Sequence, residues 1–295
     1  MKQFSLSLFL AVLMLFVGCS RRNSGIPVTA ILKKEIRGQV LDFEKPDADL
    51  MKRFTSEAKA DTVHFKDGSF ALATKNREFM DSILLPAVER RWTNLEKLSH
   101  RDLISDLALF VFEAYSSLIG PSFYRWGGDL LDLDDPQPRG ISVSRRYGLD
   151  CSGFTTAAYD LAVESGLMEA DEALFSSQGY ELFCRKSGFQ DRGALDGGSN
   201  RYRLDTRELY QLGEEVWRIE EGEKPTADQI SRLKAGDIAG RNGHFGIIAD
   251  LGGELVYLES GGWVVPAVGG RPVKVPAALT KFAKNGYVSV RRCLK

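Results

Sequence analysis

The sequence lacks the features that mark several common classes of protein. Its 295 residues carry a net charge of −1, with 39 Lys and Arg residues against 40 Asp and Glu residues. It has no basic stripe interleaved with aromatic residues, so we expect no nucleic-acid partner. Its four cysteines form no CxxC pair, which argues against a structural zinc site. We therefore expect a globular protein that needs no metal or other cofactor.

The sequence also has no apolar run near its start that would span a bilayer comfortably. An apolar run extends from Phe4 to Val17, follows Lys2, and ends at Gly18 and Cys19. A run of this length behind a positive charge is typical of the apolar region of a secretory signal peptide. We therefore expect an exported protein, with residues 1–19 as its signal segment.

The end of this segment indicates how the protein is held after export. Gly18-Cys19 resembles a bacterial lipoprotein cleavage box, and the resemblance implies that Cys19 is lipidated and becomes the mature N-terminus. Acyl chains would then anchor the protein to a membrane of the cell envelope. Ser20 suggests the outer membrane, facing the periplasm, if the cell has one. The alternative is an ordinary secretory signal that is cut nearby.

Residues 20–100 are predicted to be a tether followed by an N-terminal extension of mixed and helical structure, with no function assigned. A turn at 66–69 between short apolar runs predicts a hairpin. Two apolar stripes at helical spacing follow, over 79–95 and 103–118. We expect Pro86 to interrupt the first stripe, and both to face the core.

Cys151 is the strongest candidate for chemistry because a helical pattern starts at this residue. Phe154, Ala158 and Leu161 lie on one face of the predicted helix, and Gly166 stands where it would end. The positive end of the helix dipole favours a thiolate, which is the nucleophilic form of cysteine. The alternative is that Cys151 is a small buried hydrophobic residue.

Further stretches in chain order point to a family. They read YRWGG at 124–128, DCSGF at 150–154, AGDI at 235–238 and GHFGI at 243–247. Together they resemble the NlpC-type cell-wall cysteine peptidases, papain-like enzymes that cut bacterial peptidoglycan. The resemblance implies an α+β, papain-like domain over 101–295, with a nucleophile helix packed on an antiparallel sheet. The chain would carry insertions at 129–146 and 168–235.

The resemblance also assigns roles to individual residues. Cys151 would be the nucleophile, and His244 the general base and acid. Tyr124 would lie beside the nucleophile and bind or polarise the scissile amide. Asp150 and Ser152 would hold the amino end of the substrate.

The third catalytic residue departs from the family pattern, which has His, Asn or Gln on the strand after the histidine. Direct placement falls on Leu258, whose side chain forms no hydrogen bond. A shift of one residue brings Glu259 to the imidazole, where its carboxylate would orient the ring. Ser260 and a backbone carbonyl remain alternatives.

The resemblance implies a peptidoglycan hydrolase that acts on stem peptides, as a D-γ-glutamyl-diamino acid endopeptidase. An N-acetylmuramoyl-L-alanine amidase or an acyltransferase on the same triad is an alternative. A non-catalytic, peptidoglycan-binding lipoprotein is another, although a pure binder needs none of this chemistry.

An exported protein also permits a disulfide between Cys184 and Cys293, which no spacing rule tests.

Overall fold

The computed structural model describes residues 62–64, 70–72, 75–120, 123–125, 127–133, 147–189, 202–261 and 272–294. The expected signal segment, Cys19 and Trp126 lie outside the described residues. Most of the expected insertion at 129–146 also lies outside them. No helix in the described ranges is both long and apolar enough to cross a membrane.

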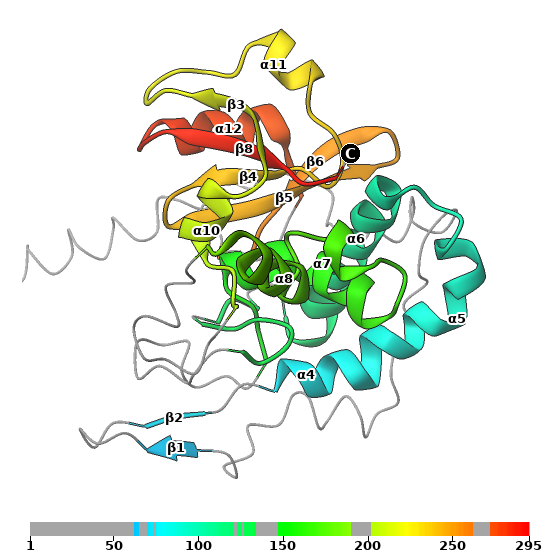
Figure 1. Ribbon diagram of the computed structural model, residues 1–295. Helices are drawn as coiled ribbons and strands as arrows, with labels where there is room; N and C mark the ends of the chain where they lie inside the picture. The colour runs from blue at the N-terminus through cyan, green and yellow to red at the C-terminus, as the bar shows by residue number, and fades with distance from the viewer. Residues whose placement is uncertain are drawn as a thin grey trace, which may run out of the picture.

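The described chain is an α+β fold built on an antiparallel sheet with strand order β3-β8-β4-β5-β6-β7 (Figure 1). The strands are β3 (Glu214–Ile219), β4 (Ile238–Arg241), β5 (His244–Leu251), β6 (Glu254–Leu258), β7 (Val273–Lys274) and β8 (Val288–Arg292). A separate hairpin pairs β1 (Thr62–His64) with β2 (Phe70–Leu72). The α+β class and this hairpin are therefore confirmed.

Helices cover the two faces of the sheet, with α6, α7 and α8 on one side and α12 on the other (Figure 1). The helical elements are α4 (Asn76–Phe79), η3 (Met80–Leu84), α5 (Leu85–Leu95), α6 (His100–Leu118), α7 (Cys151–Glu164), η5 (Ala170–Glu172), α8 (Ser177–Ser187), α10 (Thr206–Gln211), α11 (Ala227–Ser231) and α12 (Val275–Ala283).

Strand β5 is buried on both faces because helices cover each side of it. Phe245, Ile247 and Ala249 belong to the core beneath α6 and α7. Ile248 points the other way and joins a second core with Leu279 of α12. In the sequence, His244, Gly246 and Ile248 alternate with Phe245, Ile247 and Ala249, which predicts a strand packed on two sides. The structure confirms this prediction.

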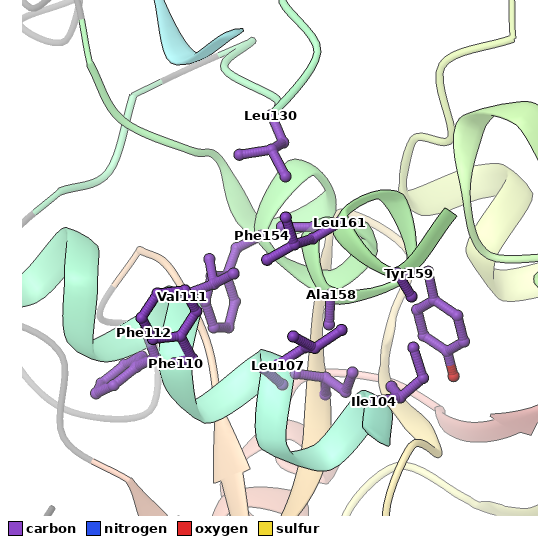
Figure 2. Packing of buried hydrophobic residues seen from close by; sticks show 14 of the residues in the cluster. Ile104, Leu107, Phe110, Val111, Phe112, Leu130, Phe154, Ala158, Tyr159 and Leu161 are labelled. Atoms are coloured by element: carbon purple, nitrogen blue, oxygen red, sulfur yellow. The ribbon is translucent and has the colours of Figure 1, made fainter. Parts of the chain in front are cut away.

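Apolar packing between α6 and α7 fixes the helix that begins at Cys151 (Figure 2). Leu107 and Val111 of α6 lie against the face of α7 that carries Phe154, Ala158 and Leu161. Each of these larger side chains contributes about 1.5–3 kcal/mol when it is fully removed from water. The same cluster also contains side chains of η3 and α5, which belong to the expected N-terminal extension at 20–100.

Pro86 does not interrupt the first predicted helix, which continues from Asn76 to Leu95. The ring of a proline clashes with the carbonyl four residues earlier in a regular α-helix. Here the five residues of η3, which lie just before Leu85 and Pro86, form a wider π turn. Pro86 then occupies the first turn of α5, where a missing N–H costs little.

The expected insertion at 168–235 contributes directly to the main sheet. Its strand β3 pairs antiparallel with β8, which lies between β3 and β4. Helix α10, which precedes β3, contacts α7, β4, β5 and β8. This segment is therefore part of the framework around the candidate site.

Candidate active site

Two short segments pair in front of helix α7 and set the position of its first residue. Tyr124 and Leu149 form an isolated parallel bridge. The amide of Leu149 donates to the carbonyl of Phe123 over 3.1 Å. The amide of Asp150 donates to the carbonyl of Gly128 over 2.9 Å. These bonds bring the YRWGG and DCSGF stretches of the sequence together.

Close backbone contact explains two of the glycines in these stretches. A Cβ atom on Gly128 would lie 2.1 Å from the carbonyl oxygen of Gly148. A Cβ atom on Gly153 would lie 2.1 Å from the carbonyl oxygen of Gly128. No side chain fits at either position unless the backbone moves.

This contact predicts the sign of a stability change. In an isolated helix, replacing Gly153 with alanine would stabilise by about 1 kcal/mol. In this fold we expect Gly153→Ala to lower the free energy of unfolding by about 1–3 kcal/mol, because the new methyl group overlaps the Gly128 carbonyl. Urea unfolding followed by circular dichroism measures this change. A raised unfolding midpoint would contradict the close approach.

The sulfur of Cys151 lies against the backbone on both sides of His244. Its Sγ atom is 4.0 Å from the carbonyl oxygen of Gly243, and the residue is 7% exposed. The backbone amide of Phe245 also hydrogen-bonds the sulfur. Residues that are distant in the chain, on α7 and β5, therefore meet at this atom.

The expectation of a lowered pKa for Cys151 is wrong for the free protein. Burial, together with the negative charge of Asp150, raises the pKa of this thiol to about 12. The amides of Phe245 and Ser152 and the charge of Arg203 oppose this rise without overcoming it. Removing the sulfur from water thus outweighs the helix terminus. The thiol is protonated at neutral pH, so a base has to take its proton.

His244 and Glu259 form a buried pair at the sheet. Nε2 of His244 lies 2.5 Å from Oε2 of Glu259, and the two residues are 1% and 6% exposed. Leu258 pairs with Ile247, and both face the core beneath α6 and α7. Because side chains alternate along a strand, Glu259 points to the other side, where His244 lies. Since Glu259 holds Nε2, Nδ1 is the ring nitrogen to consider for proton exchange with a thiol.

Tyr124 lies next to the imidazole. A Cβ atom on Gly261 would be 3.3 Å from Cδ2 of Tyr124 and 3.4 Å from Cε1 of His244, so both rings flank this glycine. Burial raises the pKa of Tyr124 above its ordinary value, and the negative charge of Asp150 adds to the effect. The phenol therefore stays protonated at neutral pH and can donate a hydrogen bond.

Ser260 does not orient the imidazole, although it was an alternative to Glu259. Its hydroxyl is buried and donates to the carbonyl of Leu149 over 2.6 Å. Ser260 thus ties the end of β6 to the loop before Cys151. Because Glu259 precedes Ser260 directly, this bond also fixes Glu259 relative to the segment before Cys151.

Asp150 and Ser152, which were expected to hold the amino end of a substrate, bind protein groups in this structure. The Asp150 carboxylate accepts from the amides of Gly153 (2.8 Å) and Gly127 (3.1 Å). It also accepts from the Ser152 hydroxyl (2.9 Å) and pairs with Arg203 (2.6 Å). Asp150 therefore caps α7. A substrate amine would have to displace Arg203 to reach this carboxylate.

The structure adds Asn76, a residue that the sequence analysis did not single out. Its buried side-chain amide donates to the carbonyl of Gly148 and accepts from the amide of Gly148, both over 2.9 Å. It also accepts from the hydroxyl of Tyr115 over 3.1 Å. Asn76 thus hydrogen-bonds both backbone groups of Gly148, as a residue of a neighbouring strand would. No pattern in the sequence indicates this contact across 72 residues.

Arg203 is a second residue that the sequence analysis missed. It comes from the expected insertion at 168–235 and pairs with Asp129 (3.3 Å) as well as Asp150 (2.6 Å). Burial raises the pKa of Asp129, while the charge of Arg203 and the amides of Leu133 and Leu131 oppose that rise. Arg203 therefore compensates two buried carboxylates beside the nucleophile.

Cys184 and Cys293, the other cysteines among the described residues, lie outside this site. Cys184 and Cys293 are free thiols, so the structure does not form the disulfide that export would permit. Within the described ranges, no group of three His, Cys, Asp or Glu side chains is placed to hold a metal ion.

The site thus brings together Cys151, His244, Glu259 and Tyr124 from α7, β5, the end of β6 and the segment that precedes α7. Comparison of the chain with models of protein families, with curated protein sequences and with solved structures gave no match.

Proposed function

We propose that this protein is a peptidoglycan hydrolase that cleaves an amide bond of the stem peptide, with Cys151 as nucleophile on a papain-like fold of the NlpC type. The observation that carries the proposal is the contact of the Cys151 sulfur with the backbone on both sides of His244, whose Nε2 is held by Glu259. A nucleophile, a base and an orienting carboxylate are the three parts that such chemistry needs.

In the proposed reaction, the sulfur of Cys151 attacks the amide carbonyl as Nδ1 of His244 takes the thiol proton. The carbon–nitrogen bond then breaks, and His244 passes its proton to the leaving amine. This leaves a thioester on Cys151. His244 next takes a proton from water, the resulting hydroxide attacks the thioester, and the sulfur leaves with a proton returned from His244.

Other groups around the sulfur support this sequence of steps. The backbone amide of Cys151 lies at the positive end of α7, where developing negative charge is stabilised. The protonated hydroxyl of Tyr124 is the second donor that we assign to the oxyanion. Glu259 stabilises the imidazolium that forms while His244 holds the proton.

The substrate class comes from the resemblance of the four sequence stretches, and the bond we assign joins D-glutamate, through its γ-carboxyl group, to the diamino acid. We further propose that lipidated Cys19 anchors the chain in the cell envelope. In a diderm cell the anchor would lie in the outer membrane, and the chain would face the periplasm. The substrate class and the lipid anchor both rest on sequence patterns and not on the geometry of the site.

A digestion experiment tests the proposal. The chain without residues 1–19 is incubated with defined muropeptides, and the products are identified by mass spectrometry. We expect products that end in D-glutamate, together with peptides that begin at the diamino acid. New L-alanine amino ends would assign the amidase instead, and transfer of the acyl group to an added amine would assign an acyltransferase. Binding without any product would leave only the peptidoglycan-binding function.

A further inference from the structure

One short segment of the expected insertion contacts both halves of the candidate site. Arg203 pairs with Asp150, the residue before Cys151, over 2.6 Å. Three residues later, the hydroxyl of Thr206 accepts a hydrogen bond from the amide of Gly243 over 3.1 Å. Gly243 precedes His244, and its carbonyl oxygen lies 4.0 Å from the Cys151 sulfur. The segment 203–206 therefore spans from the nucleophile side to the histidine side.

Arg203 carries its positive charge next to two buried carboxylates on the nucleophile side of the site. Asp129 and Asp150 are 3% and 7% exposed, so water screens their charges poorly. The guanidinium of Arg203, whose side chain is 12% exposed, lies within 3.3 Å of Asp129 and 2.6 Å of Asp150. A thiolate that forms at Cys151 would lie beside the negative charge of Asp150, which the charge of Arg203 opposes. Such a like-charge arrangement opposes ionisation of the sulfur.

We propose that Arg203 is a positioning residue that offsets Asp129 and Asp150, so that the sulfur of Cys151 can become an anion during attack. The assignment of an attack to Cys151 rests on the proposed function. The effect of Arg203 on the ionisation of the sulfur does not rest on that function, because it is a property of the protein without substrate. Arg203 acts through charge and through its hold on Asp150, and it touches no reacting atom.

The ionisation of Cys151 can be followed without any substrate. Neutral iodoacetamide alkylates thiolates, and mass spectrometry of the peptide that contains Cys151 separates this reaction from that of the other cysteines. The rate is recorded against pH. Besides Arg203, the titratable groups that interact electrostatically with the sulfur are Tyr124, Asp150 and Tyr257. His244 lies between the two residues whose backbone contacts the sulfur, and it pairs with Glu259. These stay unchanged in the variants compared below.

We expect Arg203→Gln to shift the alkylation profile to higher pH, with the rate at pH 8 about tenfold lower, as for a rise of one unit in the pKa of the thiol. Arg185→Gln removes the same charge from the exposed face of α8, where Arg185 pairs with Glu181, and should leave the profile unchanged. An unchanged profile for Arg203→Gln would overturn the proposal. Faster alkylation at every pH would also overturn it, because that result means that Arg203 only shields the sulfur.

A second variant gives the opposite sign and covers the case in which Arg203→Gln fails to fold. Asp129→Asn keeps the shape of the side chain, which accepts from the amides of Leu131 and Leu133, but removes one negative charge. We expect its alkylation profile to move to lower pH, because Arg203 then acts on fewer carboxylates. A shift to higher pH would contradict the proposal. If the protein with Arg203 and Asp129 in place cleaves no muropeptide while both alkylation shifts are observed, the proposed function alone is contradicted.

Discussion

Replacing Cys151 with alanine is expected to reduce stem-peptide cleavage by at least about a thousandfold, to the uncatalysed background. The proposed pathway passes through a thioester, and no bond of this kind forms without the sulfur. The neighbouring hydroxyl of Ser152 does not replace it, because it donates to the carboxylate of Asp150. The measurement is the rate of product formation from a defined muropeptide.

Cys184→Ala is the matched control for this variant. Cys184 is also a buried free thiol, but it lies on α8 and packs in the main core. We expect this variant to retain its cleavage rate and to lose only a modest part of its stability. Far-ultraviolet circular dichroism should show that both variants fold. Cleavage at the normal rate by Cys151→Ala would refute the mechanism.

Replacing His244 with glutamine should be nearly as severe as removing Cys151. Because burial raises the pKa of the thiol to about 12, the sulfur reacts at neutral pH only if a base takes its proton. Glu259→Gln should be milder by about a hundredfold, since loss of an orienting carboxylate costs less than loss of the base. The amide of glutamine keeps a hydrogen-bond partner for Nε2 but no longer stabilises an imidazolium.

Turnover numbers for the two variants, with the folded state checked by thermal unfolding, measure this difference. His100→Gln is the control, because His100 is exposed at the start of α6 and lies 3.8 Å from Glu172. It should leave turnover unchanged. Full activity in Glu259→Gln would assign the orienting role to another group. Equal losses in His244→Gln and Glu259→Gln would mean that the pair acts as one unit.

Local sequence patterns predict much of the secondary structure around the site. The helical pattern that begins at Cys151 predicts α7, and in the structure the carboxylate of Asp150 caps its first turn. The alternation from His244 to Ala249 predicts a strand that is buried on both faces, which the two cores confirm. These features depend on residues a few positions apart, so the sequence alone contains the relevant spacing.

Long-range contacts explain where the sequence-based expectations fall short. The wider turn of η3 accommodates Pro86, and proline propensity alone does not predict that turn. Arg203 reaches Asp150 across 53 residues, and Asn76 reaches Gly148 across 72 residues. A single arginine or asparagine carries no local pattern that indicates such a partner.

The sequence by itself determined the helix that begins at Cys151 and the strand that begins at His244. Only the tertiary structure decided that the sulfur is buried with a raised pKa, that Glu259 reaches Nε2 of His244, and that Arg203 lies between two carboxylates. The reason is physical. Helices and strands follow from neighbouring residues, whereas desolvation and charge pairing depend on every group that the fold brings to one point.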